Sequence, residues 1–149
     1  MNSEPFKSVR STEERENFLT SYIAPIRISA VSQSGFPLIC SLWFEYEDNA
    51  IWCATQKTAK IARVLSENPK CAFELAPNEP PYFGVRGQGS ATVEVADADK
   101  LLERLIDRYL GDRKSSIAKM LLNKVADEVL IRIDVKQISS WDYRNRMKA

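Results

Sequence analysis

A short basic segment, Thr55 to Lys60 (TQKTAK), lies where an apolar, strand-like run meets the start of a helical pattern. Lys57 and Lys60 lie at the start of a helix expected over 58–67, where a cation opposes the helix dipole. A bound anion would remove this conflict, because the helix amides, the Thr58 hydroxyl and the two ammonium groups together make a phosphate cradle. The alternative is an exposed basic helix start with a small dipole penalty.

Two further groups of residues have types that suit ligand binding. Gly84, Gly87 and Gly89 interrupt a strand-like run over 83–95, and glycines inside strands mark a bulge or a close approach of the backbone. The glycines either let the backbone pack against a flat ligand ring or let the strand bend at the corner of a barrel. Trp141 stands beside charged residues near the end of the sequence, where it either stacks on a ligand or anchors the tail by packing.

Composition excludes several classes of chemistry. The sequence has no histidine, which rules out a His-containing catalytic triad and removes the commonest zinc and haem ligands. Cys40, Cys53 and Cys71 are odd in number, form no CxxC and sit in apolar runs, so we expect reduced core cysteines and no metal site. No carboxylate pair suits general acid and base catalysis, and the sequence indicates no catalytic residue.

Charge and hydropathy restrict the partners. The net charge is +1, which gives no basic field for nucleic acid. No apolar run approaches the length of a membrane-spanning helix, and the charged start of the chain is unlike a signal peptide. We therefore expect a cytoplasmic protein that binds neither nucleic acid nor a membrane.

The helices and strands that position these residues can be predicted from the hydrophobic periodicity and from the residues that start and end each element. Ser11 and Glu14 form a capping box that starts a helix over 11–22. Three strands with short connections should form an antiparallel meander, and six strands in all favour a closed or split antiparallel barrel, mainly β with flanking helices (α+β), in one domain over residues 1–149. Strands that are apolar on both sides also suggest burial against a partner chain. The expected strands are 26–31, 38–46, 51–55, 70–75, 83–95 and 128–135, and the later helices are 58–67, 98–110 and one from Ser115 or Ser116 to about 125.

The sequence resembles a known family over nearly its whole length, from about Ile23 to Met147. The segments that carry the resemblance are SLWFEYED, IWCATQKTAKIARVLSENPKCAFELAPNEPPYFGVRGQG and ISSWDYRNRM. Together they resemble the pyridoxamine 5′-phosphate oxidase-like FMN-binding split barrels. The resemblance implies a six-stranded split barrel, a homodimer, and two flavin sites at the dimer interface.

The resemblance also implies which residues hold the cofactor. The flavin phosphate would bind at the basic segment, with Lys60 at the family's basic position and Thr58 just before it. The isoalloxazine ring would lie along the second strand, and residues of the long fifth strand and the C-terminal tryptophan would be further contacts. The candidate cofactor-binding residues are Cys40, Ser41, Leu42, Thr55, Gln56, Lys57, Thr58, Lys60, Arg86, Gln88 and Trp141.

Departures from the family pattern narrow the expected activity. True pyridoxamine phosphate oxidases carry an Arg and a Lys on the second strand, where this chain has LICSLWF, and their C-terminal Arg-x-His element is missing here. Oxidation of vitamin B6 is therefore not expected. The expected function is an FMN-dependent oxidoreductase with a small-molecule substrate or electron acceptor. The alternatives are a non-catalytic flavin carrier and an F420-dependent reductase, for which Lys57, Arg63 and Arg86 would hold the longer anionic tail.

Overall fold

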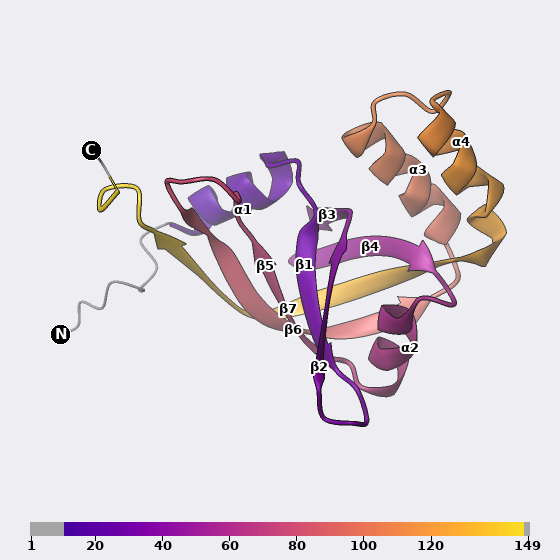
Figure 1. Ribbon diagram of the computed structural model, residues 1–149, viewed down its shortest axis with the longest axis horizontal. Helices are drawn as coiled ribbons and strands as arrows, with labels where there is room; N and C mark the ends of the chain where they lie inside the picture. The colour runs from indigo at the N-terminus through magenta and orange to yellow at the C-terminus, as the bar shows by residue number, and fades with distance from the viewer. Residues whose placement is uncertain (1–10, 148–149) are drawn as a thin grey trace.

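The computed structural model describes residues 11–147, which form one curled antiparallel sheet with helices on both of its faces (Figure 1). Within these residues the sheet has seven strands in the order β2-β1-β5-β6-β7-β4-β3. The helices are α1 (Thr12–Ser21), α2 (Lys60–Glu67), α3 (Ala98–Tyr109) and α4 (Ser116–Asn123), and a 3-10 turn, η1, covers Val125–Asp127. The strands are β1 (Ile26–Val31), β2 (Pro37–Leu42), β3 (Phe44–Glu47), β4 (Ala50–Gln56), β5 (Lys70–Leu75), β6 (Phe83–Glu94) and β7 (Glu128–Asp142).

The predicted split-barrel type and its mainly-β class are confirmed, but six strands is wrong. The run expected as one strand over 38–46 divides at Trp43 into β2 and β3. Leu42 pairs with β1, whereas Phe44 pairs with β4. Both antiparallel pairings of the predicted meander are therefore present, but the strand that makes them is divided between the two opposite edges of the sheet. The sheet curls because two consecutive pieces of chain occupy its two edges.

The last strand is longer than predicted. β7 runs to Asp142, and it pairs with β6 along almost the whole length of both strands. The register shifts once, at Gln88 and Gly89, which is a β-bulge that bends the sheet. Trp141 therefore lies in the strand, opposite Gly84, and does not belong to a tail.

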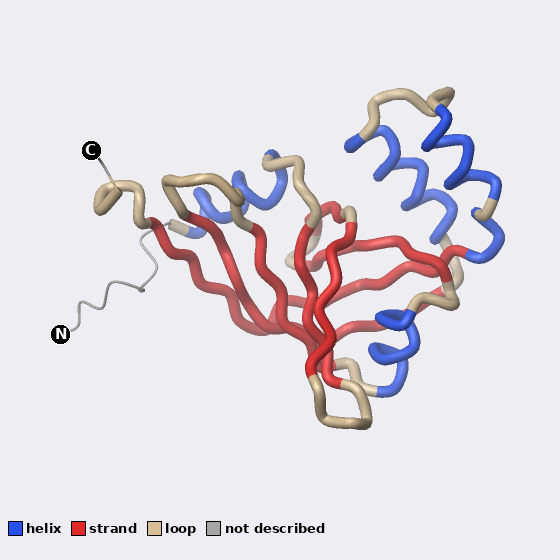
Figure 2. Tube along the Cα trace, viewed as in Figure 1, coloured by secondary structure: helices blue, strands red, loops and turns tan. Residues whose placement is uncertain are grey.

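The main core lies inside the curl of the sheet, and Figure 2 shows the path of the strands around it. Strand alternation sends Ile26 and Ile28 of β1 inward, both fully buried, while Arg27 faces solvent. Leu19 of α1 and Leu65 of α2 close the core from two sides. Burial of these side chains drives the folding of the sheet around them.

A second layer consists of α3 and α4, which lie side by side at one end of the sheet (Figure 1). α3 packs Leu101 and Leu105 against Leu130 of β7. Tyr109, at the end of α3, stacks on Trp43 with ring centroids 4.9 Å apart and donates its hydroxyl to the Ala24 carbonyl at 2.8 Å. These contacts hold the helices against the point where β2 gives way to β3.

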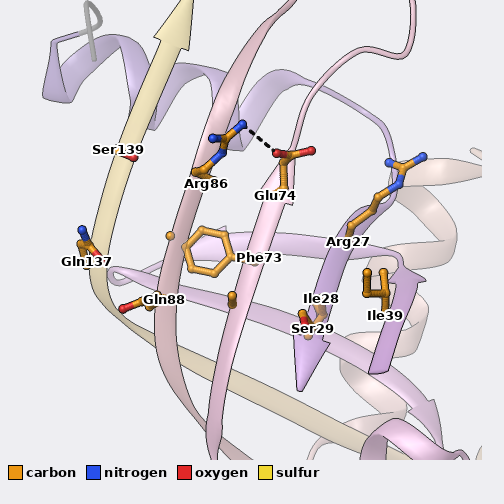
Figure 3. Close-up of a pocket in the computed structure, with 12 residues that line it drawn as sticks. Arg27, Ile28, Ser29, Ile39, Phe73, Glu74, Arg86, Gln88, Gln137 and Ser139 are labelled. Carbon is orange, nitrogen blue, oxygen red and sulfur yellow. Dashed lines mark ion pairs between the residues drawn. The ribbon is translucent and has the colours of Figure 1, made fainter. Parts of the chain in front are cut away.

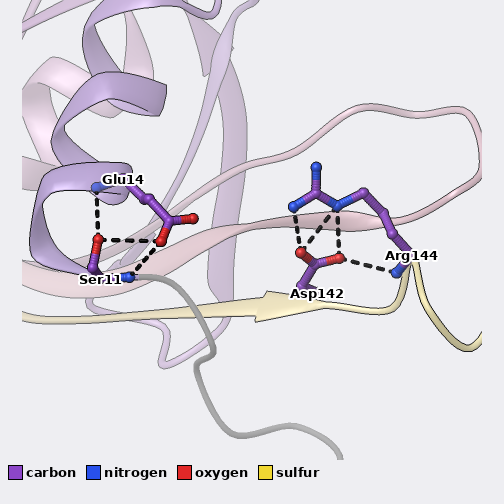
Figure 4. A network of polar contacts seen from close by, with 4 residues as sticks. All are labelled: Ser11, Glu14, Asp142 and Arg144. Carbon is purple, nitrogen blue, oxygen red and sulfur yellow. Dashed lines mark hydrogen bonds and ion pairs between the residues drawn. The ribbon is translucent and has the colours of Figure 1, made fainter.

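Of the four α-helices within residues 11–147, α1 and α4 have a side-chain cap at their first turn, and α2 and α3 have none. The capping box of Ser11 and Glu14 at the start of α1 is confirmed (Figure 4), and Ser115 caps α4 by accepting from the Ala118 amide. At the other end of the chain, Figure 4 shows Arg144 paired with Asp142 just beyond β7. α2 differs: it begins at Lys60 instead of residue 58, and no side chain caps it. No helix within residues 11–147 has the length and hydropathy that crossing a membrane requires.

Candidate functional site

Two hollows bring together most of the residues that the sequence singled out. The first, which we call the outer groove, lies on the convex side of β1, β5, β6 and β7 and has a volume of about 400 Å³ (Figure 3). Phe73 and Gly87 are among its lining residues, and charged side chains come from the neighbouring strands. The lining residues with polar side chains are Arg27, Ser29, Glu74, Arg86, Gln88, Gln137 and Ser139.

Arg86 organises one side of the outer groove. Its guanidinium carbon lies 4.1 Å from the centre of the Trp141 ring, and its Nη2 pairs with Glu74 Oε2 at 3.2 Å. Trp141 is only 7% exposed because Arg86 lies over it and Gly84 lies opposite. Trp141 is thus a packing anchor in this chain, and Arg86 is the part of the pair that faces solvent.

Close packing within the sheet accounts for the three glycines of β6. A Cβ on Gly84 would lie 2.7 Å from the Trp141 ring, and one on Gly87 would lie 2.2 Å from the Gln137 carbonyl oxygen. A Cβ on Gly89 would lie 2.5 Å from Cγ2 of Ile133. Of the two interpretations of these glycines, the barrel bend explains them without a ligand ring.

The second hollow, which we call the helix–sheet pocket, lies between α3, α4 and the ends of β2 and β4, with a volume of about 410 Å³. Trp43 stands in its wall at the break between β2 and β3. Four of the predicted cofactor residues, Ser41, Leu42, Thr55 and Gln56, line it. The other lining residues are Trp43, Ala54, Leu102, Leu105, Ile117, Met120, Leu121, Lys124 and Glu128.

Glu128 is the residue in this pocket that sequence reasoning missed. It is 5% exposed, and its Oε1 accepts a hydrogen bond of 2.5 Å from Gln56 Nε2. Its Oε2 is buried and has no hydrogen-bond partner within the described residues. Burial raises the pKa of the Glu128 carboxyl above its usual 4.5, and the Gln56 bond offsets part of that rise. An acid next to Asp127 at the start of a strand gives no sequence signal of burial, and only the pairing of β4 with β7 places Glu128 opposite Gln56.

The basic segment lies next to this pocket, at the exposed start of α2. Lys57 and Thr58 form a turn after β4, and Lys60 is the first residue of the helix. The Lys57 ammonium lies 3.1 Å from an Asp127 carboxylate oxygen. Lys57 therefore precedes the helix and has an acidic partner, so the predicted conflict with the helix dipole is wrong for Lys57 and remains only for Lys60.

The remaining predicted residues lie apart from the pocket. Arg86, Gln88 and Trp141 belong to the outer face of β6 and β7, and Cys40 packs against the main core. The two hollows have no lining residue in common. One chain thus does not bring the eleven candidates into one site.

The cysteines supply no nucleophile. All three are free thiols, with Cys53 and Cys71 buried and Cys40 partly so. Burial raises the pKa of each thiol, to about 11 for Cys71, where a hydrogen bond to the Gly89 carbonyl offsets part of the rise. A raised pKa keeps a thiol protonated and unreactive at neutral pH.

Comparisons with known proteins agree with this architecture. Residues 11–142 match the family model described as pyridoxamine 5′-phosphate oxidase. A conserved hypothetical protein from Mycobacterium tuberculosis is 22% identical, with a TM-score of 0.79 over 99% of this chain and 94% of that one. An F420 reductase is 21% identical, with a TM-score of 0.68 over 88% of this chain and 98% of that one. An FAD-binding protein from Mesorhizobium loti is 16% identical, with a TM-score of 0.66 over 88% and 94%. No curated protein matches the sequence.

Proposed function

The chain belongs to the pyridoxamine 5′-phosphate oxidase family, and on this basis we propose that it is a cytoplasmic, homodimeric flavoprotein that binds FMN and acts as an oxidoreductase. Its substrate or electron acceptor is a small molecule. The bound flavin would supply the electron or hydride chemistry, and the protein would supply binding, orientation and electrostatics. No side chain needs to act as a proton donor for such a transfer, which suits a site without histidine.

The observation that carries this proposal is the continuity between the helix–sheet pocket and the start of α2. Thr55 and Gln56 line the pocket, and Lys60 begins the helix only four residues after Gln56. Thr58 and Lys60 are exposed, and no side chain caps α2. A helix start with a hydroxyl and an ammonium group suits a phosphate, and an apolar pocket suits a ring. FMN carries both groups, so the residues present fit it.

The outer groove supports the dimeric part of the proposal. Arg86 and Gln88 are predicted cofactor contacts, yet they line a different hollow from Ser41 and Thr55. A second copy of the chain would bring its outer groove to the first copy's cofactor. Ile39, which is 68% exposed, lines this groove and would be buried by that contact.

Pyridoxamine phosphate is a poor match for this chain. The helix–sheet pocket has leucine, tryptophan and methionine walls, and Lys124 is the one cation among its described lining residues. β2 carries no Arg or Lys at all. A phosphorylated substrate would therefore lose the charge-assisted bonds that a phosphate needs.

The first experiment is an absorbance spectrum of the purified protein, followed by titration with FMN and with F420. A two-band flavin spectrum or tight uptake of FMN supports the proposal, and uptake of F420 alone replaces it with the F420 reductase that the structural similarity also suggests. Binding of neither cofactor overturns both. If FMN binds but no electron acceptor from a broad panel is reduced, the protein is a flavin carrier and the oxidoreductase assignment fails.

The dimeric site has its own test. Lys60→Ala and Arg86→Ala are co-expressed with different tags, and the mixed dimer is isolated by two affinity steps. If each site takes Lys60 from one chain and Arg86 from the other, one site of the mixed dimer has both substitutions and the other has neither. Half of the FMN should then bind with normal affinity, whereas each homodimeric variant has none of these normal sites. Two equally weakened sites would contradict the shared site.

A further inference from the structure

Trp43 stands at the point where the chain passes from one edge of the sheet to the other. Leu42 ends β2, which pairs with β1, and Phe44 begins β3, which pairs with β4. Trp43 belongs to neither strand. β3 is an edge strand, so the side of its backbone that faces away from β4 needs hydrogen-bond partners from outside the sheet.

Tyr109 of α3 supplies such a partner with its hydroxyl. The hydroxyl oxygen accepts a hydrogen bond from the Phe44 amide at 3.1 Å. The hydroxyl donates to the Ala24 carbonyl at 2.8 Å, which is closer than the Phe44 carbonyl at 3.4 Å. Burial raises the pKa of the Tyr109 phenol above its usual 10, and the backbone hydrogen bond with Phe44 offsets part of that rise, so the phenol keeps its proton at neutral pH. One hydroxyl thus joins the residues before β1 to the first residue of β3.

The ring of Tyr109 also fixes the indole of Trp43. The two ring centroids are 4.9 Å apart and the planes are inclined by 5°, so the rings are stacked. Trp43 lines the helix–sheet pocket, whereas Tyr109 does not. Any effect of Tyr109 on a molecule in the pocket therefore passes through Trp43.

The end of α3 that carries Tyr109 is anchored to α1 by Arg108. Arg108 donates from Nη1 to the Thr20 carbonyl at 2.8 Å and from Nη2 to the Tyr22 carbonyl at 3.3 Å. These carbonyls lie at the C-terminal end of α1, where backbone oxygens lack partners within the helix and a cation is favourable. Because α1 packs into the main core, these bonds tie the end of α3 to the body of the fold.

We propose that the Trp43 indole contacts the isoalloxazine ring of the bound flavin, and that Tyr109 is the positioning residue that holds the indole for this contact. The inference rests on the proposed function, because it places the flavin ring in the helix–sheet pocket. An indole is electron-rich and the oxidised isoalloxazine ring is electron-poor, so the contact favours the oxidised flavin. Aromatic rings in offset or edge-on contact add affinity beyond the area that they bury.

The role of Trp43 is tested by the fluorescence of bound FMN. It should be quenched in the wild type, because an indole in contact with the excited flavin ring donates an electron to it. Trp43→Leu keeps an apolar wall without the indole, so saturating FMN should fluoresce more strongly and its Kd should rise about two- to tenfold. Trp43→Phe keeps a ring to stack on Tyr109 and should also restore the fluorescence, which covers a folding defect in the leucine variant.

Trp52→Leu is the matched control for this experiment. Trp52 packs against the same face of α3 but does not line the pocket, so its removal should leave both quenching and affinity as in the wild type. Unchanged quenching in the Trp43 variants, with thermal unfolding showing that they are folded, would overturn the proposal.

Two substitutions separate the contacts that Tyr109 makes. Tyr109→Phe keeps the stacked ring and loses the hydroxyl, whereas Tyr109→Leu loses both. Quenching at saturating FMN should fall in Tyr109→Phe and fall further in Tyr109→Leu. Leu75→Val, a change in the main core away from the pocket lining, lowers stability and should leave quenching unchanged. If the Tyr109 variants melt at lower temperature but keep full quenching, Tyr109 has a structural role only and the positioning role is contradicted.

NMR of the indole N–H groups distinguishes failure of this inference from failure of the flavin assignment. The Trp43 signal is assigned by its loss in Trp43→Phe. In the flavin-free protein, Tyr109→Phe should move this signal and leave that of Trp52 in place. FMN should then shift the Trp43 signal more than the Trp52 signal. If the absorbance spectrum shows bound FMN but the Trp43 signal does not shift, this inference fails and the proposed function stands. If no FMN binds, both fail together.

Discussion

The outer groove and the helix–sheet pocket have nearly the same volume, about 400 and 410 Å³, but their polar groups are in opposite states. In the groove, Arg86 and Glu74 are exposed and paired with each other. In the pocket, Glu128 is buried and half of its carboxyl is unpaired. A surface whose charges satisfy one another is ready to meet another protein surface with little desolvation. A buried acid with an unpaired oxygen instead carries a desolvation cost, which favours its neutral form.

The largest effect on stability is expected from Gly87→Ala, at a residue that lines the outer groove. The added Cβ would lie 2.2 Å from the Gln137 carbonyl oxygen and 2.6 Å from the Phe73 ring, and the backbone contact cannot be relieved by turning a side chain. We expect a loss of about 3 kcal/mol in the free energy of unfolding, measured by urea denaturation.

Gly35→Ala is the control for this substitution. Gly35 has a positive φ of 85° but nothing within 4 Å of an added Cβ, so only the backbone penalty of about 1–2 kcal/mol applies. If Gly87→Ala costs no more than Gly35→Ala, then the sheet is looser at its bend than the structure indicates, and the groove is not a rigid surface.

The next effect is on FMN affinity and concerns the start of α2, beside the helix–sheet pocket. Lys60→Ala should weaken FMN binding by about 1–3 kcal/mol, the usual value of a charge-assisted hydrogen bond, and should leave the melting temperature without cofactor almost unchanged. Lys57→Ala should weaken FMN binding less, because Lys57 already pairs with Asp127. Fluorescence titration with FMN measures both. A loss of stability with unchanged affinity would assign Lys60 a structural role and separate the pocket from the phosphate site.

Sequence reasoning recovered the elements that local chemistry determines. The capping box of Ser11 and Glu14, the glycine-rich β6 and the helices 98–110 and 115–125 all follow from short-range patterns. The division of the second strand at Trp43 could not be predicted from the sequence, because LICSLWFEY has no glycine or proline. The two halves of this segment differ only in the distant strand with which each one pairs. The burial of Glu128 was not predicted for the same reason, because it depends on Gln56, which lies 72 residues earlier in the chain.

A smaller effect is expected on the pH dependence of stability, and its sign follows from the raised pKa of Glu128. Because the pKa of Glu128 is raised in the folded protein, the wild type should lose stability as pH rises from the usual value of 4.5 through the raised value. Glu128→Gln has no such group, so its melting temperature should gain on the wild type as the pH rises above the usual value of 4.5. Differential scanning calorimetry measures the gap. A gap that is constant with pH would mean that solvent reaches the Glu128 carboxyl, and the contrast between pocket and groove would disappear.

The smallest effect is expected from the same chemical change made in the groove, Glu74→Gln. Glu74 pairs with Arg86, but the side chains of both are about half exposed, and exposed ion pairs contribute little to stability. The free energy of unfolding should change by less than about 0.5 kcal/mol. The substitution does release Arg86 from its acidic partner, so an effect on dimerisation, measured by sedimentation equilibrium, would show that the groove acts through its charges between chains. If Glu74→Gln instead altered stability as much as Glu128→Gln, burial would not be what distinguishes the two carboxyls.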